Sequence, residues 1–62
     1  MSAPKKYVAR YYDGSVTLEA VFEAPNVIIA EALARGFLID IQNKVPSEEG
    51  FRIKAVAYLK DA

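Results

Sequence analysis

The side chains that most often carry catalysis are missing from this sequence. It contains no cysteine and no histidine, which excludes thiolate chemistry and an imidazole base or metal ligand. Gly14, Gly36 and Gly50 stand too far apart to form a phosphate-binding loop. Glu48 and Glu49 are adjacent, but a cation there would need more oxygen ligands than the neighbouring residues offer. We therefore expect no catalytic site, no metal site and no cofactor, and we expect that the protein is not an enzyme.

Tyrosine and basic side chains alternate along two of the expected strands, where their chemistry suits binding. The candidate partner-binding face consists of Arg10, Tyr12, Lys54, Val56, Tyr58 and Lys60. Tyrosine rings can stack on bases while Lys and Arg contact phosphates, as on a nucleic-acid interface. The same rings can anchor a protein partner. A solvated face with paired charges is the third interpretation.

The charge balance bears on the choice between these interpretations. Eight Lys and Arg residues offset eight Asp and Glu residues, so the protein as a whole has no net attraction for nucleic acid or membrane surfaces. Glu19 and Glu23 are expected on the same sheet face, where they would repel phosphate. These features count against nucleic acid, which stays the alternative partner.

Two alternating segments joined by a turn pair predict a β-hairpin. Residues 6–12 (KYVARYY) are rich in aromatic and β-branched types, and residues 15–23 (SVTLEAVFE) alternate apolar and polar side chains. Asp13 and Gly14 stand between them, and an Asp-Gly pair in this position is a strong hairpin signal because glycine adopts positive φ easily.

One long apolar segment, residues 25–45, predicts a helix. Asn26 can cap its first turn through the side-chain oxygen. Gly36 leaves two possibilities open. It can lie within a long helix at a cost of about 1 kcal/mol, or it can end the helix. In the second case residues 37–43, which also alternate, become an extra strand.

These segments assemble into an α+β fold of ββαβ order, forming a single domain over residues 1–62. Residues 51–60 (FRIKAVAYLK) form the last strand, and a right-handed crossover makes it parallel to the second strand. The three-stranded antiparallel sheet then has the order 2-1-3, with the helix packed on one face. A helix ending at Gly36 gives the alternative ββαββ order. Residues 1–5 are expected to be a flexible N-terminal tail. The helix-facing side chains of the sheet are expected to be Tyr7, Ala9, Tyr11, Leu18, Phe22, Ile53 and Leu59.

The helix carries more apolar surface than one sheet face can cover. Ile29, Leu33, Phe37 and Ile41 form the stripe that we expect to cover the sheet. A second stripe beside it consists of Ile28, Ala32 and Ile39. A single small domain has nothing left to bury this second stripe, so it is the predicted interface of a homo-oligomer, most simply a dimer. The last strand, an edge of the sheet, is the second route to self-association.

The order of motifs resembles that of small uncharacterised phage-encoded proteins of the hairpin-helix-strand type. The resemblance covers the first half of the chain: a tyrosine-rich strand, Asp13 and Gly14, a strand ending at Ala24, and Asn26 opening an alanine-containing helix. It implies an accessory or host-directed binding role without catalytic residues.

The sequence therefore predicts a non-enzymatic protein-binding or assembly module that acts as a homo-oligomer. Its partners are expected to be a second copy of the chain and a protein whose identity the residues do not reveal. The alternative is a small nucleic-acid-binding protein that uses the open sheet face. No apolar segment reaches the roughly 18 residues needed to span a bilayer, so we expect no membrane partner. A cytoplasmic location is expected, which is the host cytoplasm if the protein is phage-encoded.

Overall fold

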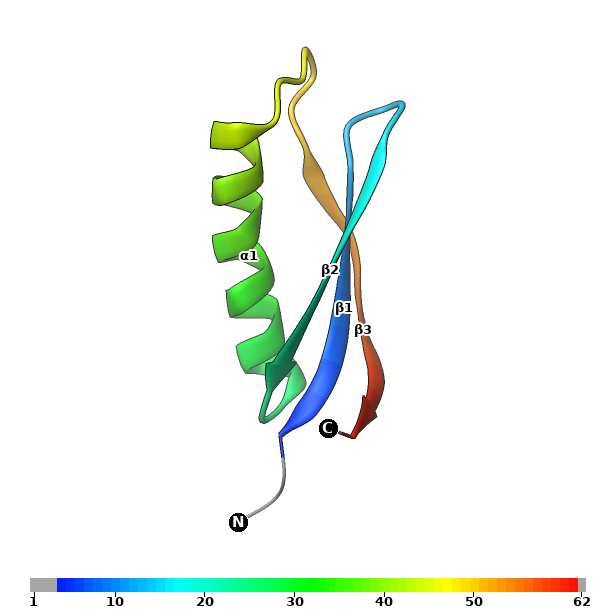
Figure 1. Cartoon of the computed structure of the whole chain (residues 1–62), viewed down its shortest axis with the longest axis vertical. Helices are drawn as coiled ribbons and strands as arrows, with labels where there is room; N and C mark the ends of the chain where they lie inside the picture. Colours follow the sequence, from blue (N-terminus) through cyan, green and yellow to red (C-terminus); the bar gives the residue numbers. More distant parts are fainter. Residues whose placement is uncertain (1–3, 62) are drawn as a thin grey trace.

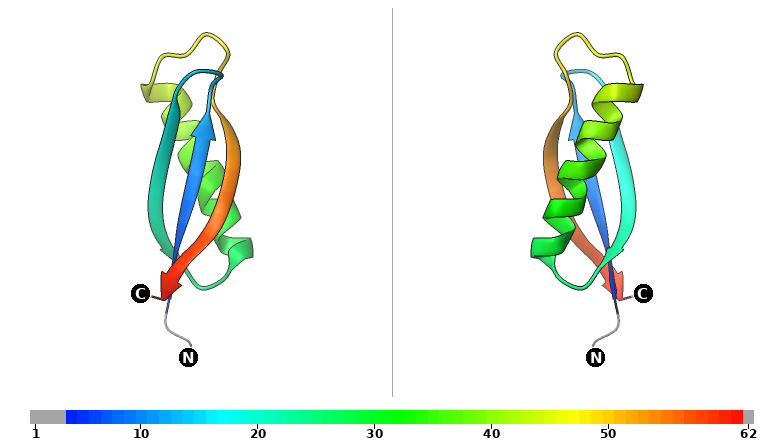
Figure 2. Two further views of the ribbon diagram at one scale, coloured as in Figure 1. Left: turned by 90° about the vertical axis from the view of Figure 1, so that its right-hand side faces the viewer. Right: turned by 90° about the vertical axis from the view of Figure 1, so that its left-hand side faces the viewer.

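The fold is a three-stranded antiparallel sheet with one helix packed on one of its faces. The computed structural model describes residues 4–61, which form β1 (Lys5–Tyr12), β2 (Thr17–Ala24), α1 (Val27–Lys44) and β3 (Arg52–Asp61) (Figure 1). The sheet order is β2-β1-β3. The predicted α+β class, strand order and single helix are therefore confirmed. The helix crosses one face of the sheet diagonally, and the described residues leave the other face uncovered (Figure 2).

The N-terminal boundary differs slightly from the prediction. Residues 1–3 of the expected flexible tail lie outside the described residues. Lys5, which was assigned to that tail, already belongs to β1 and pairs with Ala24 of β2. The hairpin register then continues without interruption to the pair of Tyr12 and Thr17. The two strands of the hairpin therefore match over their full length.

The long-helix interpretation is confirmed. The Asn26 side chain accepts a 3.0 Å hydrogen bond from the Ile29 N–H, which satisfies one of the free donors of the first turn. At the other end, the Val45 N–H donates to the Ile41 carbonyl over 2.8 Å. Gly36 lies inside the helix, so residues 37–43 are helical and add no strand.

The helix packs on the sheet through small residues, not through the predicted large stripe. Ala30 and Ala34 are the buried residues of α1, and they face the buried rings of Tyr7 and Tyr11 from β1. Because these rings fill the space between the layers, only small helix residues fit against them. Of the predicted stripe, Ile41 packs against the buried cluster, whereas Ile29, Leu33 and Phe37 are exposed.

Two register shifts in β3 change which of its residues face the helix. The first lies between Arg10 and Tyr11, whose partners are Ala55 and Ile53. Lys54 is therefore an extra residue, a β-bulge that reverses the alternation of the residues that follow. Val56 consequently packs against the core beneath α1, and its predicted position on the open face is wrong.

The bulge also turns Tyr58 to the helix side. Tyr58 lies opposite Tyr7, and their rings meet edge to face at 5.8 Å between centroids. The second shift lies between Lys6 and Tyr7. It makes Leu59 the extra residue and returns Lys60 to the open face, opposite Lys6. Leu59 is exposed, so its predicted contact with the helix is also wrong.

Candidate interaction surfaces

The predicted interface residues of α1 lie on its solvent-exposed surface. Ile28 is 73% exposed and Ile39 is 64% exposed, and Ala32 between them is exposed as well. We call these three residues the outer stripe. Their exposure agrees with the prediction that the sheet leaves them uncovered, while their role as an interface stays a prediction.

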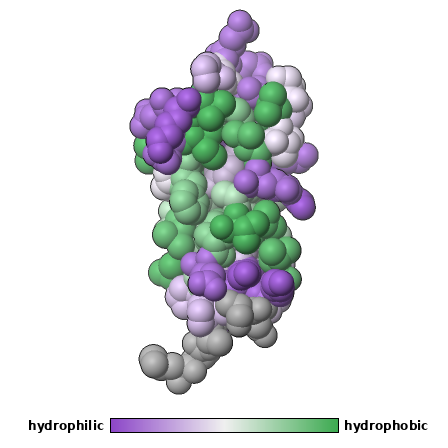
Figure 3. Space-filling view, viewed as in Figure 1, coloured by the Kyte–Doolittle hydropathy of each residue, from purple (hydrophilic) through white to green (hydrophobic). Residues whose placement is uncertain are grey.

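A second exposed apolar surface lies along α1 and reaches β2 at Phe37. Ile29, Leu33 and Phe37 are 42%, 40% and 38% exposed. The ring of Phe37 contacts that of Phe22 on β2, with 5.4 Å between centroids. We call these four residues the α1–β2 patch. Figure 3, which views the molecule from the same side as Figure 1, shows hydrophobic surface extending across this region of the helix and sheet.

Sequence periodicity predicted that most residues of this patch belong to the core. It therefore did not identify them as an exposed surface. The signal that could have revealed it is the spacing of Ala30 and Ala34. Alanines four residues apart form a narrow stripe that lets a helix approach a sheet closely, and the larger side chains beside that stripe are then displaced to the flank.

The edge strand β2 is paired regularly along its whole length. β2 pairs with β1 without any register shift. Its carboxylates are matched within the monomer, because Arg10 Nε donates to Glu19 Oε2 over 2.6 Å and Glu23 lies opposite Lys6. β2 contains no Lys, Arg or Pro, residues that commonly protect an edge strand from pairing.

The open face of the sheet retains only part of the predicted partner-binding set. Tyr12 lies there, with Arg52 and Lys54 over its ring at 5.7 Å and 5.5 Å from the centroid. Arg10 and Lys60 share this face, whereas Val56 and Tyr58 lie on the helix side. The structure therefore gathers one tyrosine and several cations on this face, instead of the two tyrosines that the sequence predicted.

The tip of the hairpin is tied to the loop that precedes β3. Asp13 Oδ1 accepts hydrogen bonds from the N–H groups of Ser15 (3.0 Å) and Val16 (2.8 Å), and Asp13 Oδ2 accepts one from the Ser47 hydroxyl (2.9 Å). The Val16 and Ser15 amides and the Ser47 hydroxyl lower the pKa of Asp13 to about 2. Ser47 in turn accepts from the Gly50 N–H over 3.1 Å. These hydrogen bonds hold the hairpin tip and the loop together, and the lowered pKa makes the Asp13 carboxylate a weak base toward the Ser47 hydroxyl.

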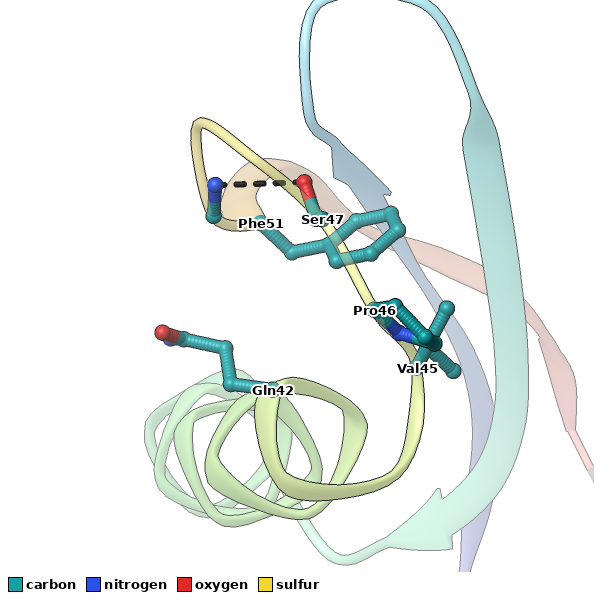
Figure 4. A pocket seen from close by; sticks show the side chains of 6 residues that line it. Gln42, Val45, Pro46, Ser47 and Phe51 are labelled. Atoms are coloured by element: carbon teal, nitrogen blue, oxygen red, sulfur yellow. Dashed lines mark hydrogen bonds between the residues drawn. The ribbon is translucent and has the colours of Figure 1, made fainter.

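Hollows in the described surface lie at the hairpin tip and beside α1. The one at the tip, of about 450 Å³, is lined by Asp13, Ser47 and Glu48 among others. One hollow of about 350 Å³ lies between the end of α1 and the following loop, with Gln42, Pro46 and Phe51 in its lining (Figure 4). Another of about 330 Å³ lies between α1 and β3, with Glu31 and Arg35 at its rim. Among residues 4–61, no cluster of three or more acidic side chains is placed to hold a metal ion.

Comparison of the chain with models of known protein families, with curated proteins and with solved structures finds no match. Within the described part of the chain, no helix is long and apolar enough to cross a membrane.

Proposed function

We propose that the protein is a non-enzymatic protein-binding or assembly module that acts as a homo-oligomer. The observation that carries this proposal is the exposed apolar surface of α1, which comprises the outer stripe and the α1–β2 patch. Several large aliphatic side chains of α1 are exposed to solvent. Contiguous apolar patches are uncommon on soluble monomers and mark interaction sites.

The small size of the core supports the same proposal. Among the described residues, the buried hydrophobic side chains are Tyr7, Val8, Ala9, Tyr11, Ala24, Ala30, Ala34 and Phe51. Half of them are alanines, which bury little area. Burial of apolar surface stabilises a fold by roughly 25 cal/mol per Å², and the core of a chain of this length leaves only a small margin of stability. The chain has no cysteine for a disulfide, and association with a second copy would increase the buried apolar area.

The resemblance to small phage-encoded proteins supports an accessory or host-directed role for this module. On this proposal the protein acts in the cytoplasm of the host and binds a host or phage protein there. The open face and the apolar surface of α1 are then available for self-association and for that second partner.

The solution mass tests the proposal. We expect sedimentation to give twice the chain mass of 6.8 kDa at micromolar concentration. Ile28→Glu disturbs the outer stripe and Leu33→Glu disturbs the α1–β2 patch, so at least one of them should lower the mass, because a buried unpaired carboxylate is costly. Gln42→Glu adds the same charge elsewhere on α1 and serves as the control. A cooperatively folded wild type that stays monomeric at every concentration would contradict the proposal.

One observation favours a second candidate, a nucleic-acid-binding role for the open face. The ring of Tyr12 with Arg52 and Lys54 over it combines a stacking surface with two cations, which is the pairing that single-strand binders use. The Arg10–Glu19 ion pair beside it neutralises one further cation, and Tyr58 supplies no second ring on this face. This candidate therefore ranks below the protein-binding proposal.

A further inference from the structure

The two edges of the sheet differ in their capacity to pair with another strand. β3 contains two register shifts along its pairing with β1, and bulges twist an edge away from further pairing. Its exposed cations Arg52, Lys54 and Lys60 oppose strand addition as well. These features make the predicted pairing of β3 with its own symmetry mate unfavourable. β2 has neither bulges nor cations.

The hydrogen bonding of the hairpin determines which residues of β2 direct their backbone N–H and C=O groups away from β1. The Asp13 N–H donates to the Val16 carbonyl over 3.3 Å, which fixes one hydrogen-bonded position between the strands. Such positions recur at every second residue of an antiparallel pair, so Leu18, Ala20 and Phe22 direct their backbone groups toward β1. The alternate residues of β2 then direct theirs outward from the sheet. They are Thr17, Glu19, Val21 and Glu23.

We propose that β2 pairs with β2 of a second copy, antiparallel, about a two-fold axis at Ala20. The proposal rests on the proposed homo-oligomer and specifies its geometry. It joins two three-stranded sheets into one of six strands, with both helices on the same face. On that face the part of each α1–β2 patch nearest the second copy is the contact of Phe37 with Phe22 of β2.

Charge excludes the two registers next to this one, and the length of the paired segment favours it over registers shifted further. Centring the pair at Ala20 places Glu19 opposite Val21 and Thr17 opposite Glu23, so no two carboxylates face one another. Centring the pair at Val21 would place Glu19 directly opposite Glu23 of the second copy. Centring it at Glu19 would place the two Glu19 side chains opposite one another. Like charges directly opposite one another destabilise a strand pair. The Ala20 register also pairs residues 17–23 in full.

The same register is favourable on the helix side of the sheet. Leu18 and Phe22 of opposite copies become direct neighbours, and Ala20 faces its own copy. These positions are non-hydrogen-bonded pairs, in which side chains approach most closely. Leu18 and Phe22 already pack partly against the core, so the new contacts extend that core across the interface toward Phe37, which Phe22 touches.

A single introduced cysteine tests the register, because the chain has no native cysteine. In a non-hydrogen-bonded pair the Cα atoms lie about 4.5 Å apart, within the roughly 4.4–6.8 Å that a disulfide spans. We expect Ala20→Cys to form a disulfide-linked dimer in nearly full yield under mild oxidation. Ala32→Cys, on the outer stripe of α1, is the matched control and should stay largely uncross-linked.

A proline substitution tests the edge independently. The Val21 N–H points outward, so Val21→Pro removes a donor to the second copy without removing one to β1. We expect a folded variant whose dimer dissociation constant is larger by on the order of tenfold or more. Val21→Ala should keep the dissociation constant of the wild type. A folded Val21→Pro variant with unchanged dimer affinity would overturn the proposal, and if the variant does not fold, the cysteine result decides.

The outcomes distinguish the β2 pairing from the homo-oligomer proposal on which it rests. A dimeric wild type in which Ala32→Cys cross-links and Ala20→Cys does not would overturn the β2 pairing and leave the homo-oligomer intact. A wild type that is monomeric at all concentrations would overturn both. Cross-linking at Ala20 together with dissociation of Val21→Pro is the result that the β2 pairing requires.

Discussion

The hydroxyl of Tyr11 on β1 donates a 2.7 Å hydrogen bond to the backbone carbonyl of Ala34, halfway along α1. Both residues are fully buried. The bond links the central strand to the middle of the helix and gives the phenol a partner where no water reaches it. Burial raises the pKa of the Tyr11 hydroxyl above its ordinary value. The close approach depends on the small side chain of Ala34.

Tyr11→Phe should lower the free energy of unfolding by about 0.5–1.5 kcal/mol, the usual value of one such hydrogen bond. The ring is kept, so packing between the layers is largely preserved. Chemical denaturation monitored by circular dichroism measures the change. Tyr12→Phe is the matched control, because its hydroxyl bonds to the nearby Gly14 carbonyl in an exposed turn. Equal losses in the two variants would show that the buried bond contributes nothing beyond an exposed one.

Acid should destabilise the fold through Asp13. Its pKa falls from 3.8 to about 2 on folding, so the unfolded chain binds the proton more readily. The stabilisation is therefore complete above about pH 4 and is lost as the pH falls toward 2. We expect the melting temperature to fall across this window, and we expect Asp13→Asn to reduce that dependence.

Asp40→Asn serves as the control for the acid experiment. Asp40 forms an exposed ion pair with Lys44 at 3.2 Å, and its replacement leaves the Asp13 turn intact. This variant should keep the wild-type loss of melting temperature below pH 4. If Asp13→Asn shows the same acid sensitivity as the wild type, the turn carboxylate does not cause it.

The strands and the helix follow from local sequence, while the faces of β3 and α1 do not. The Asp13–Gly14 turn and the Asn26 cap are short-range signals, which is why the hairpin and the helix start were predictable. The bulge at Lys54 has no such signal, because a regular alternation continues through it in the sequence. Only pairing with β1 reveals that Val56 and Tyr58 turn toward the helix.

The core stripe of α1 was unpredictable for a related reason. Hydrophobic periodicity weights large residues most heavily, and it therefore favoured Leu33 and Phe37 over Ala30 and Ala34. The choice between these stripes depends on the volume of Tyr7 and Tyr11 across the layer. That volume is contributed by another element, so helix periodicity alone cannot include it.

Substituting leucine for alanine at two positions of α1 tests this assignment. Ala34→Leu should destabilise the fold by about 1–3 kcal/mol or more, because the added atoms have no space beside Tyr11. Ala32→Leu, two residues away on the outer stripe, should change the free energy of unfolding by less than about 0.5 kcal/mol. Thermal unfolding of both variants gives the comparison. A larger loss at Ala32 than at Ala34 would reverse the assignment of buried and outer surfaces.

Gly36 offers a stabilising substitution. It lies within α1, and apart from its chain neighbours and the adjoining helix backbone, a Cβ atom at this position would meet no atom within 4 Å. Gly36→Ala should therefore raise the free energy of unfolding by about 1 kcal/mol, the difference in helix propensity between the two residues. Denaturant titration measures this gain. A loss of stability would indicate that another molecule packs closely against Gly36 in solution.

The last prediction concerns the open face and uses salt to separate its two possible partners. If the face binds single-stranded nucleic acid, Tyr12→Ala should weaken binding by about 1–3 kcal/mol through lost stacking. Lys54→Ala should make the log–log dependence of affinity on salt shallower by roughly 0.7. Fluorescence anisotropy with a short oligonucleotide at several salt concentrations measures both. Glu48→Gln, in the loop before β3, is the control for a change of charge away from this face. If neither Tyr12→Ala nor Lys54→Ala alters the affinity for the oligonucleotide, the open face is excluded as a nucleic-acid interface. The proposed protein-binding role then rests on α1 and the β2 edge.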